Sequence, residues 1–407
     1  MTNGTLSAKA ARYLHTLCVE IPSRRVGSPG NRQATDLFAS VMSSFGFEVQ
    51  SPPFDCMDWH QEGVGLMVGA VPFQAFASPY SLGCRVYAPL VVVSTLAELE
   101  AAELEGTVVL LRGELTQGQL MPKNFTFYNP DEHKHIYALL EAKQPLAIIA
   151  ATSRDPEMVG GQYPFPLFED GDFDIPSVYM TDIEGNRVAE QAGKDVWLES
   201  RATRTRSTGC NVVARKETDA KHRAVLFAHI DSRMGTPGAN DNASGVMALL
   251  LLAELLADYQ GRLGIELVSV NGEDYYSNPG EMQWLAINAG RFDEIVLGIN
   301  LDDVGYYRGK VAYSLYDCPE VMAVTIREVL SRHADLMEGP PWYQGDHGLF
   351  LANSRPALAM TTELLSEVMA EITHTAKDTA ETVDPARPLA VAVALRDLLL
   401  ELNRDLA

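Results

Sequence analysis

The chain has 407 residues, enough for two or three domains with a sizeable core, and its 46% hydrophobic and 21% charged content is ordinary for a globular protein. The formal net charge of −22 argues against nucleic acid or an anionic membrane as a partner, because phosphate binding needs a basic surface. Five scattered cysteines without a CxxC pair are typical of reduced thiols in the cytoplasm rather than of metal ligands.

Residues 1–56 are expected to form the helical N-terminal part of the main domain. Apolar positions recur at helical spacing over residues 5–20 and 31–45, and the turn-rich stretch IPSRRVGSPGN joins the two helices. This end lacks the apolar core of a signal peptide, and no apolar run in the chain is long enough to cross a bilayer. The sequence therefore predicts a cytoplasmic protein.

Residues 57–207 have a different texture. Short apolar strands such as GLMVGAV, PLVVVST and GTVVLLRG alternate with Gly and Pro, and helical periodicity is scarce. We expect an inserted β-rich domain.

From residue 208 to 407 the pattern is strand, loop and long helix, repeated. The expected strands are NVVAR, AVLFAHI, GIELVSV, IVLGINL, KVAYSLY and ALAMTTE. Helices expected at about 243–258, 280–289, 318–334 and 388–403 separate most of them. Continuous apolar strands that alternate with amphipathic helices predict an α/β fold, in which helices cover both faces of a mostly parallel sheet.

Ionisable residues follow these strands where each strand ends. In an open α/β sheet this edge is where ligands bind. Without a cation so many carboxylates would repel one another and raise their pKa values. Histidine nitrogens and carboxylate oxygens suit zinc, and two ions that share a carboxylate can activate a water molecule and polarise a carbonyl group. The ionisable residues expected at this edge of the sheet are His229, Asp231, Asp241, Glu273, Asp274, Asp302 and His374.

The motifs around these residues occur in a recognisable order. AHIDS, GANDNASG, NGED, NLDDVG, GDHGLF and THT resemble those of the di-zinc aminopeptidases of metallopeptidase clan MH, family twenty-eight. The resemblance covers residues 208–404 and the GSPGN lead-in. It implies a metal-dependent exopeptidase with two divalent ions, for which zinc is expected.

The resemblance also implies a ligand set. His229 and Asp302 would bind one metal, Asp274 and His374 the other, and Asp241 would bridge the two. Many members have Glu where this chain has Asp274, which is shorter.

Two further residues receive catalytic roles from the resemblance. Glu273 would be the general base, and Asp231 would orient the His229 imidazole without binding the metal itself. The peptide bond after Asp241 would be cis. Thr373 stands where many members have a Tyr that supports the tetrahedral intermediate, so the donor to that oxygen stays open.

The inserted segment resembles a protease-associated domain through LEGTVVLLRG, PLAIIAAT and FDIPSVYMTD. Asp346 and His347 match a family motif near the substrate, although such a pair also fits an ordinary turn.

Several functions remain open at this level. An aminopeptidase that acts on peptides is the leading interpretation, because acidic residues suit a cationic α-amino group. A carboxypeptidase would need cations for a substrate carboxylate, and Arg233, Arg308 and Arg355 lie near the motifs. A glutaminyl cyclase commonly uses one zinc, and a non-catalytic receptor-like relative would have lost ligands. The sequence does not predict the oligomeric state.

Overall fold

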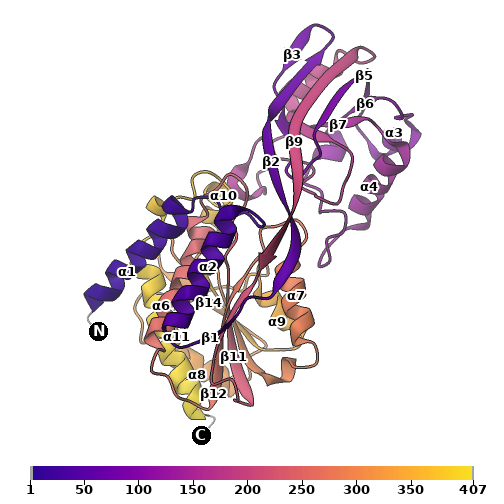
Figure 1. The fold of residues 1–407 in the computed structure, drawn as a ribbon. Coiled ribbons are helices and arrows are strands. Elements are labelled where there is room, and N and C mark those ends of the chain that lie inside the picture. Colours follow the sequence, from indigo (N-terminus) through magenta and orange to yellow (C-terminus); the bar gives the residue numbers. More distant parts are fainter. Residues whose placement is uncertain (1–2, 406–407) are drawn as a thin grey trace. The chain divides into compact units, whose positions relative to one another are not determined.

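The computed structural model describes residues 3–405, and the chain divides into two compact units (Figure 1). The first unit consists of the N-terminal segment up to Cys56 and the segment from Thr208 onward. The second consists of Met57–Ser207. Each unit contains one eight-stranded sheet.

The sheet of the first unit has parallel strands at its centre. In chain order its strands are β1 (Glu48–Gln50), β10 (Val212–Lys216), β11 (His222–His229), β12 (Leu263–Val270), β13 (Ile295–Leu301), β14 (Val311–Tyr316), β15 (Leu336–Glu338) and β16 (Ala357–Thr362). They are arranged as β1-β10-β12-β11-β13-β16-β14-β15. Strands β12, β11, β13 and β16 run parallel, and antiparallel pairs flank them.

Helices cover both faces of this sheet (Figure 1). One face packs against α1 (Asn3–His15), α2 (Pro29–Ser44), α6 (Gly245–Leu255), α8 (Glu320–Leu330) and α11 (Ala386–Asp405). The other packs against α7 (Pro279–Asn288) and α9 (His347–Ala352), through Trp284 and Phe350. The helix α10 (Leu365–Glu371) contacts Tyr306. The predicted α/β fold with a mostly parallel sheet between helices is confirmed.

Helix α6 begins two residues later than the sequence predicted. The backbones of Asp241 and Asn242 are not helical, and the side chain of Asn242 accepts a hydrogen bond from the N–H of Gly245. A Cβ atom on Gly245 would lie 2.6 Å from the carbonyl oxygen of Leu301, so only glycine allows the helix to start this close to β13.

The second unit is also α/β. Its strands are β2 (Pro53–Val68), β3 (Val71–Phe73), β4 (Phe76–Ala77), β5 (Cys84–Val93), β6 (Val108–Leu111), β7 (Ala147–Thr152), β8 (Ser177–Thr181) and β9 (Asp195–Cys210). They are arranged as β3-β2-β9-β5-β6-β7-β8-β4, with β5 to β8 parallel. Helices α3 (Leu96–Ala101), α4 (Asp131–Lys143) and α5 (Asp182–Ala189) accompany them. The sequence predicted fewer helices in this segment. Helix α4 is hard to recognise from the sequence, because it buries only three residues and the residues around them are largely charged.

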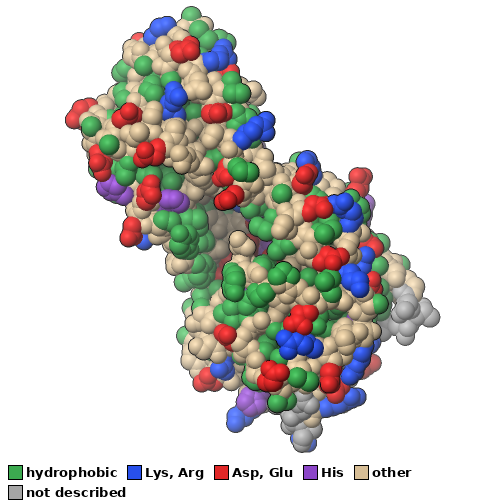
Figure 2. Space-filling model, turned by 180° about the vertical axis from the view of Figure 1, so that it is seen from behind, with side chains coloured by type: hydrophobic (Ala, Val, Ile, Leu, Met, Phe, Trp, Pro, Cys, Tyr) green, Lys and Arg blue, Asp and Glu red, His purple; other side chains and the backbone are tan. Residues whose placement is uncertain are grey.

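The surface charges add little to the functional interpretation. On the face in Figure 2, acidic and basic side chains are interspersed. Among residues 3–405, no helix has both the length and the apolar character needed to cross a bilayer.

An ion pair fixes the N-terminal helix to the core and yields a stability prediction. Glu254 is 3% exposed within the apolar helix α6, and both of its carboxylate oxygens accept from Lys9 Nζ, at 2.6 and 2.7 Å. We expect Lys9→Met to lower the free energy of unfolding by about 3 kcal/mol, because it leaves a buried carboxylate without its cation. The double variant Lys9→Met/Glu254→Leu should regain most of this loss in urea titrations. A single variant as stable as the wild type would contradict the prediction.

Candidate metal centre

Metal-binding side chains from separate segments meet at the carboxyl edge of the first sheet. His229 ends β11, Asp241 precedes α6, and Asp274 follows β12. One ligand atom from each lies within 4.8 Å of the others, the only such group of three or more His, Cys, Asp and Glu found among residues 3–405.

Asp241 lies between two histidines. Its Oδ1 is 3.0 Å from His229 Nε2, and its Oδ2 is 3.2 Å from His374 Nε2. Each histidine has a second carboxylate beside the same nitrogen: Asp302 Oδ1 is 3.5 Å from His229, and Asp274 Oδ1 is 2.8 Å from His374. The structure thus brings together all five side chains that the sequence predicted as ligands, in two His–Asp pairs that share one carboxylate.

The backbone around Asp241 is unusual. The Asp241–Asn242 peptide bond is cis, which confirms the expectation from the resemblance. Asn242 donates from Nδ2 to the carbonyl oxygen of Leu301 at 2.7 Å, and Leu301 directly precedes Asp302. One hydrogen bond therefore connects the segments that carry two of the five predicted ligands.

The protonation of this cluster fits a cationic ligand. Burial alone would raise the pKa of Asp241, but its close contacts with His229 and His374 outweigh it and hold that pKa well below its ordinary value. Burial lowers the pKa of His374, yet Asp274 and Asp241 raise it to about 10. Carboxylates that favour positive charge at the two histidines in this way also suit a divalent cation.

Two buried carboxylate oxygens also fit a bound metal ion. Among residues 3–405, no donor makes a hydrogen bond to buried Asp274 Oδ2, and buried Asp302 Oδ1 has no hydrogen bond beyond its 3.5 Å ion-pair contact with His229. Buried carboxylate oxygens are normally paired or bound to a metal. The donor set of two imidazoles and three carboxylates therefore fits divalent metal ions such as zinc.

Asp231 contacts the neighbouring loop more closely than the imidazole that it was expected to orient. Its Oδ1 is 3.8 Å from His229 Nδ1, which is beyond hydrogen-bond distance. Its two oxygens accept instead from the N–H groups of Gly272 and Asp274, at 2.7 and 3.0 Å. Burial raises its pKa to about 6. Asp231 thus holds the loop on which Glu273 and Asp274 lie.

Glu273 is half-buried beside this cluster. Burial raises the pKa of Glu273 well above its ordinary value, and the positive charge of His229 opposes the shift only in part. A carboxylate whose affinity for a proton is raised in this way suits a general base.

His374 occupies a loop after α10 and has φ of +63°, a left-handed conformation that is uncommon for a residue other than glycine. An N–H of Arg233 lies 3.0 Å from its Nδ1. The sequence named Arg233 only as a cation near the motifs, and the structure places it directly beside the predicted ligand.

The remaining motif residues are buried. Asp346 directly precedes α9 and is 4% exposed. His347 Nε2 lies 2.9 Å from the carbonyl oxygen of Trp342, and the two rings pack at 4.6 Å. The Thr373 hydroxyl is buried without a hydrogen-bond partner among residues 3–405.

Arg24 and Asp378 were not among the residues for which the sequence predicted a role. Arg24 is completely buried and donates to the carbonyl oxygens of Leu17, Ile230, Pro237 and Gly238, at 2.7 to 2.9 Å. It therefore fixes the segment between His229 and Asp241. Its only sequence signal is its place before GSPGN, in a turn-rich stretch where burial is not expected.

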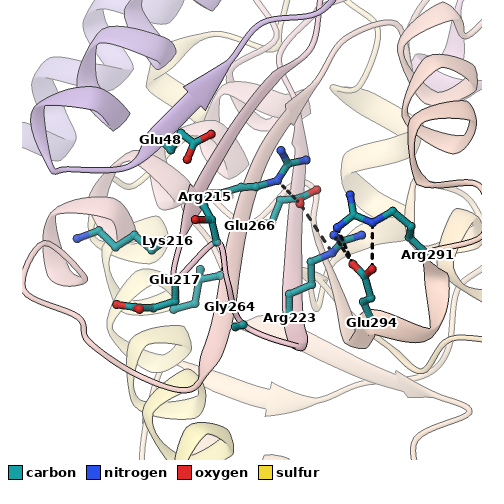
Figure 3. Close-up of a pocket in the computed structure, with 12 residues that line it drawn as sticks. Glu48, Arg215, Lys216, Glu217, Arg223, Gly264, Glu266, Arg291 and Glu294 are labelled. Carbon is teal, nitrogen blue, oxygen red and sulfur yellow. Dashed lines mark hydrogen bonds and ion pairs between the residues drawn. The ribbon is translucent and has the colours of Figure 1, made fainter.

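A pocket lies where the parallel strands begin, at the opposite edge from the histidines (Figure 3). Its three arginines are paired with carboxylates within the pocket. Arg215 Nε is 2.8 Å from Glu266, and Glu294 accepts from Arg223 at 3.0 Å and from Arg291 at 2.8 Å. This pocket is an internal ion-pair network, so the cluster around Asp241 is the stronger candidate site.

Comparisons with known proteins show what this chain is similar to. The sequence model of Peptidase family M28 matches residues 211–399. A probable lipoprotein aminopeptidase of Mycobacterium tuberculosis, LpqL, is 28% identical over 248 residues, which are 58% of this chain and 45% of the relative. A probable leucine aminopeptidase 2 of Aspergillus oryzae is 25% identical over 253 residues, 60% of this chain and 47% of the relative. The chain spans about half the length of these curated relatives.

Solved structures share the fold over nearly the whole chain. An aminopeptidase from Aneurinibacillus sp. strain AM-1 has a TM-score of 0.74 at 21% identity, covering 97% of this chain and 93% of that one. The zinc aminopeptidase BSAP of Bacillus subtilis has 0.73 at 18% identity, covering 97% and 94%. A glutaminyl cyclase of Porphyromonas gingivalis has 0.51 at 15% identity, covering 97% and 98%. At these identities the likeness describes the fold alone.

Proposed function

We propose that the chain is a metal-dependent aminopeptidase that releases N-terminal residues from peptides, because residues 211–399 match the model of Peptidase family M28. The observation that carries the proposal is the position of Asp241 between His229 and His374. One carboxylate that faces two imidazoles, each with a further carboxylate, is the arrangement that two adjacent divalent ions need.

We assign the ligands as follows. His229 and Asp302 would hold one ion, His374 and Asp274 would hold the other, and Asp241 would hold both. Zinc is the expected metal, because these are imidazole and carboxylate ligands and the structurally similar BSAP of Bacillus subtilis is a zinc aminopeptidase by name. Two bound ions would lower the pKa of a water molecule and polarise the carbonyl group of the scissile bond.

Glu273 moves the proton in this proposal. It takes a proton from the attacking water, whose oxygen forms a bond to the carbonyl carbon. It then gives that proton to the nitrogen as the C–N bond breaks, and the remaining proton of the new carboxylic acid passes to the amine, so that a carboxylate and an ammonium group leave. The raised pKa of Glu273 suits a group that holds the proton between the two steps. Asp231 keeps Glu273 in place through the N–H groups of Gly272 and Asp274.

The function is tested by comparing peptides with a free and with an acetylated N-terminus. We expect release of N-terminal residues from the free peptides alone, together with loss of activity on chelation and its recovery on addition of zinc. Metal content is measured on the same sample, where about two ions per chain are expected.

Other outcomes would replace the proposal. Cleavage at the C-terminus of acetylated peptides would indicate a carboxypeptidase. Ammonia release from N-terminal glutamine without hydrolysis would indicate a glutaminyl cyclase. A metal-loaded protein that turns over none of these peptides would indicate a non-catalytic relative.

We further propose that Met57–Ser207 is a protease-associated-like module inserted into the catalytic domain. The parallel strands β5 to β8 with their helices support an independent core, since the two faces of this sheet carry separate apolar clusters. We also propose a cytoplasmic location, where the five cysteines would stay reduced. Fractionation of cells that express the full-length protein tests this location.

A further inference from the structure

Asp378 makes an unusual set of contacts four residues after His374. Its carboxylate is completely buried and accepts from the main chain of another segment: Oδ1 is 2.8 Å from the nitrogen of Asn240, and Oδ2 is 3.1 Å from the nitrogen of Asp241. Its carbonyl oxygen accepts from the nitrogen of Ala239 at 3.2 Å. Three consecutive N–H groups that lead into Asp241 therefore end on this one residue.

Side chains strengthen the same attachment. Asn240 is completely buried and donates from Nδ2 to Asp378 Oδ1 at 3.2 Å and to Thr382 Oγ1 at 2.7 Å. The N–H of Asp378 donates to the carbonyl oxygen of Thr375 at 3.2 Å, so the loop that follows His374 turns back on itself. This loop is thus fastened to the segment of Asp241 by main-chain and side-chain hydrogen bonds.

An acid at this position is costly, because its carboxylate is completely buried. A neutral cap such as Ser or Thr would avoid this cost if the segment needed only one acceptor. A carboxylate offers two equivalent acceptor oxygens, whereas the amide of Asn would turn its NH2 group toward one of the two N–H donors.

We propose that Asp378 is a positioning residue that sets the direction of the shared Asp241 carboxylate and fixes its distance from His374. The inference rests on the proposed metal site. The distance of 3.2 Å between Asp241 Oδ2 and His374 Nε2 joins two segments that are far apart in sequence. Asp378 belongs to the loop of one and binds the backbone of the other, so moving it displaces the only ligand that both metal ions share.

The test is Asp378→Asn, with the affinity for each metal measured by competition between the protein and a chelating indicator, using Zn²⁺ and Co²⁺. We expect the dissociation constants of both ions to rise together by about 10-fold or more, as for other residues that support ligands. The Co²⁺ absorption spectrum should change as well, because the shared carboxylate turns. Circular dichroism and thermal unfolding establish that the variant is folded.

Asp170 provides a matched control in the other compact unit. It is 2% exposed and accepts from the N–H groups of Lys123 and Asp172, at 2.6 and 2.7 Å. Asp170→Asn removes the same kind of buried acceptor, so it should lower the unfolding temperature without changing the metal affinities. Equal losses of metal affinity in the two variants would reduce the effect to general destabilisation and overturn the proposal.

A milder variant covers the case in which Asp378→Asn does not fold. Asn240→Ala keeps the main-chain bonds and removes the side-chain bonds, and it should weaken both ions by several-fold; unchanged affinities would overturn the inference.

If the wild type binds metal and a folded Asp378→Asn protein binds it equally well, this inference alone fails. If the wild type binds none, the proposed function fails and this inference with it.

Discussion

Replacing Glu273 by Gln is expected to lower kcat by roughly 100-fold or more, while the protein keeps both metal ions. The amide has almost the same shape as the carboxylate but cannot accept the proton of the attacking water. KM should change little, because the proposed ligands and the other side chains around them remain. Steady-state kinetics and metal analysis on the same preparation check this expectation.

Asp274→Asn is the matched control for that experiment, since it alters the adjacent residue in the same way. It weakens one proposed ligand, so its defect should be partly rescued by added zinc, which Glu273→Gln should not be. The assignment is reversed if Glu273→Gln loses metal and Asp274→Asn does not. If neither variant loses activity, the hydrolase proposal is wrong.

The second large effect is expected at Asp241. Asp241→Asn should remove both metal ions together and abolish activity, because this side chain is the one within reach of both histidines. The wild-type unfolding temperature should rise with zinc concentration, since a ligand that binds only the folded state stabilises it. The variant should lose this dependence.

Asp302→Asn separates loss of a shared ligand from loss of a single one. Its carboxylate lies near His229, so it should weaken one ion and leave the other bound. Retention of one ion by Asp241→Asn would show that the carboxylate is not shared.

The end points of the strands explain how much of the site the sequence could predict. His229, Glu273 and Asp302 each follow an apolar run, and parallel strands deliver their carboxyl ends to one edge. The fold class and the meeting of these residues therefore follow from local patterns together with one topological rule. The resemblance carried by the ordered motifs added the expected roles that the patterns alone left open.

Other features depend on contacts that no local pattern encodes. Asp378 resembles any loop acid until the segment of Asp241 is placed against it, and Arg24 resembles any surface arginine until four carbonyl oxygens surround it. The preference of Asp231 for the N–H groups of the neighbouring loop has the same origin, because spacing fixes neither the direction nor the length of a side-chain contact. Capping by a distant carboxylate becomes visible only in three dimensions.

The division of the first unit into two pieces of chain has a consequence for its synthesis. Helices α1 and α2 pack on a sheet whose strands come almost entirely from residues after 208, so their partners do not yet exist when they leave the ribosome. At roughly 5 to 20 residues per second, the intervening chain takes about ten seconds or more to be made. The second unit, which is continuous in sequence, can complete its own core during that time. The apolar faces of α1 and α2, which bear Leu6 and Phe38, therefore stay exposed during this time. Other components of the cell, and not the protein's own sheet, must cover them until the later strands are made.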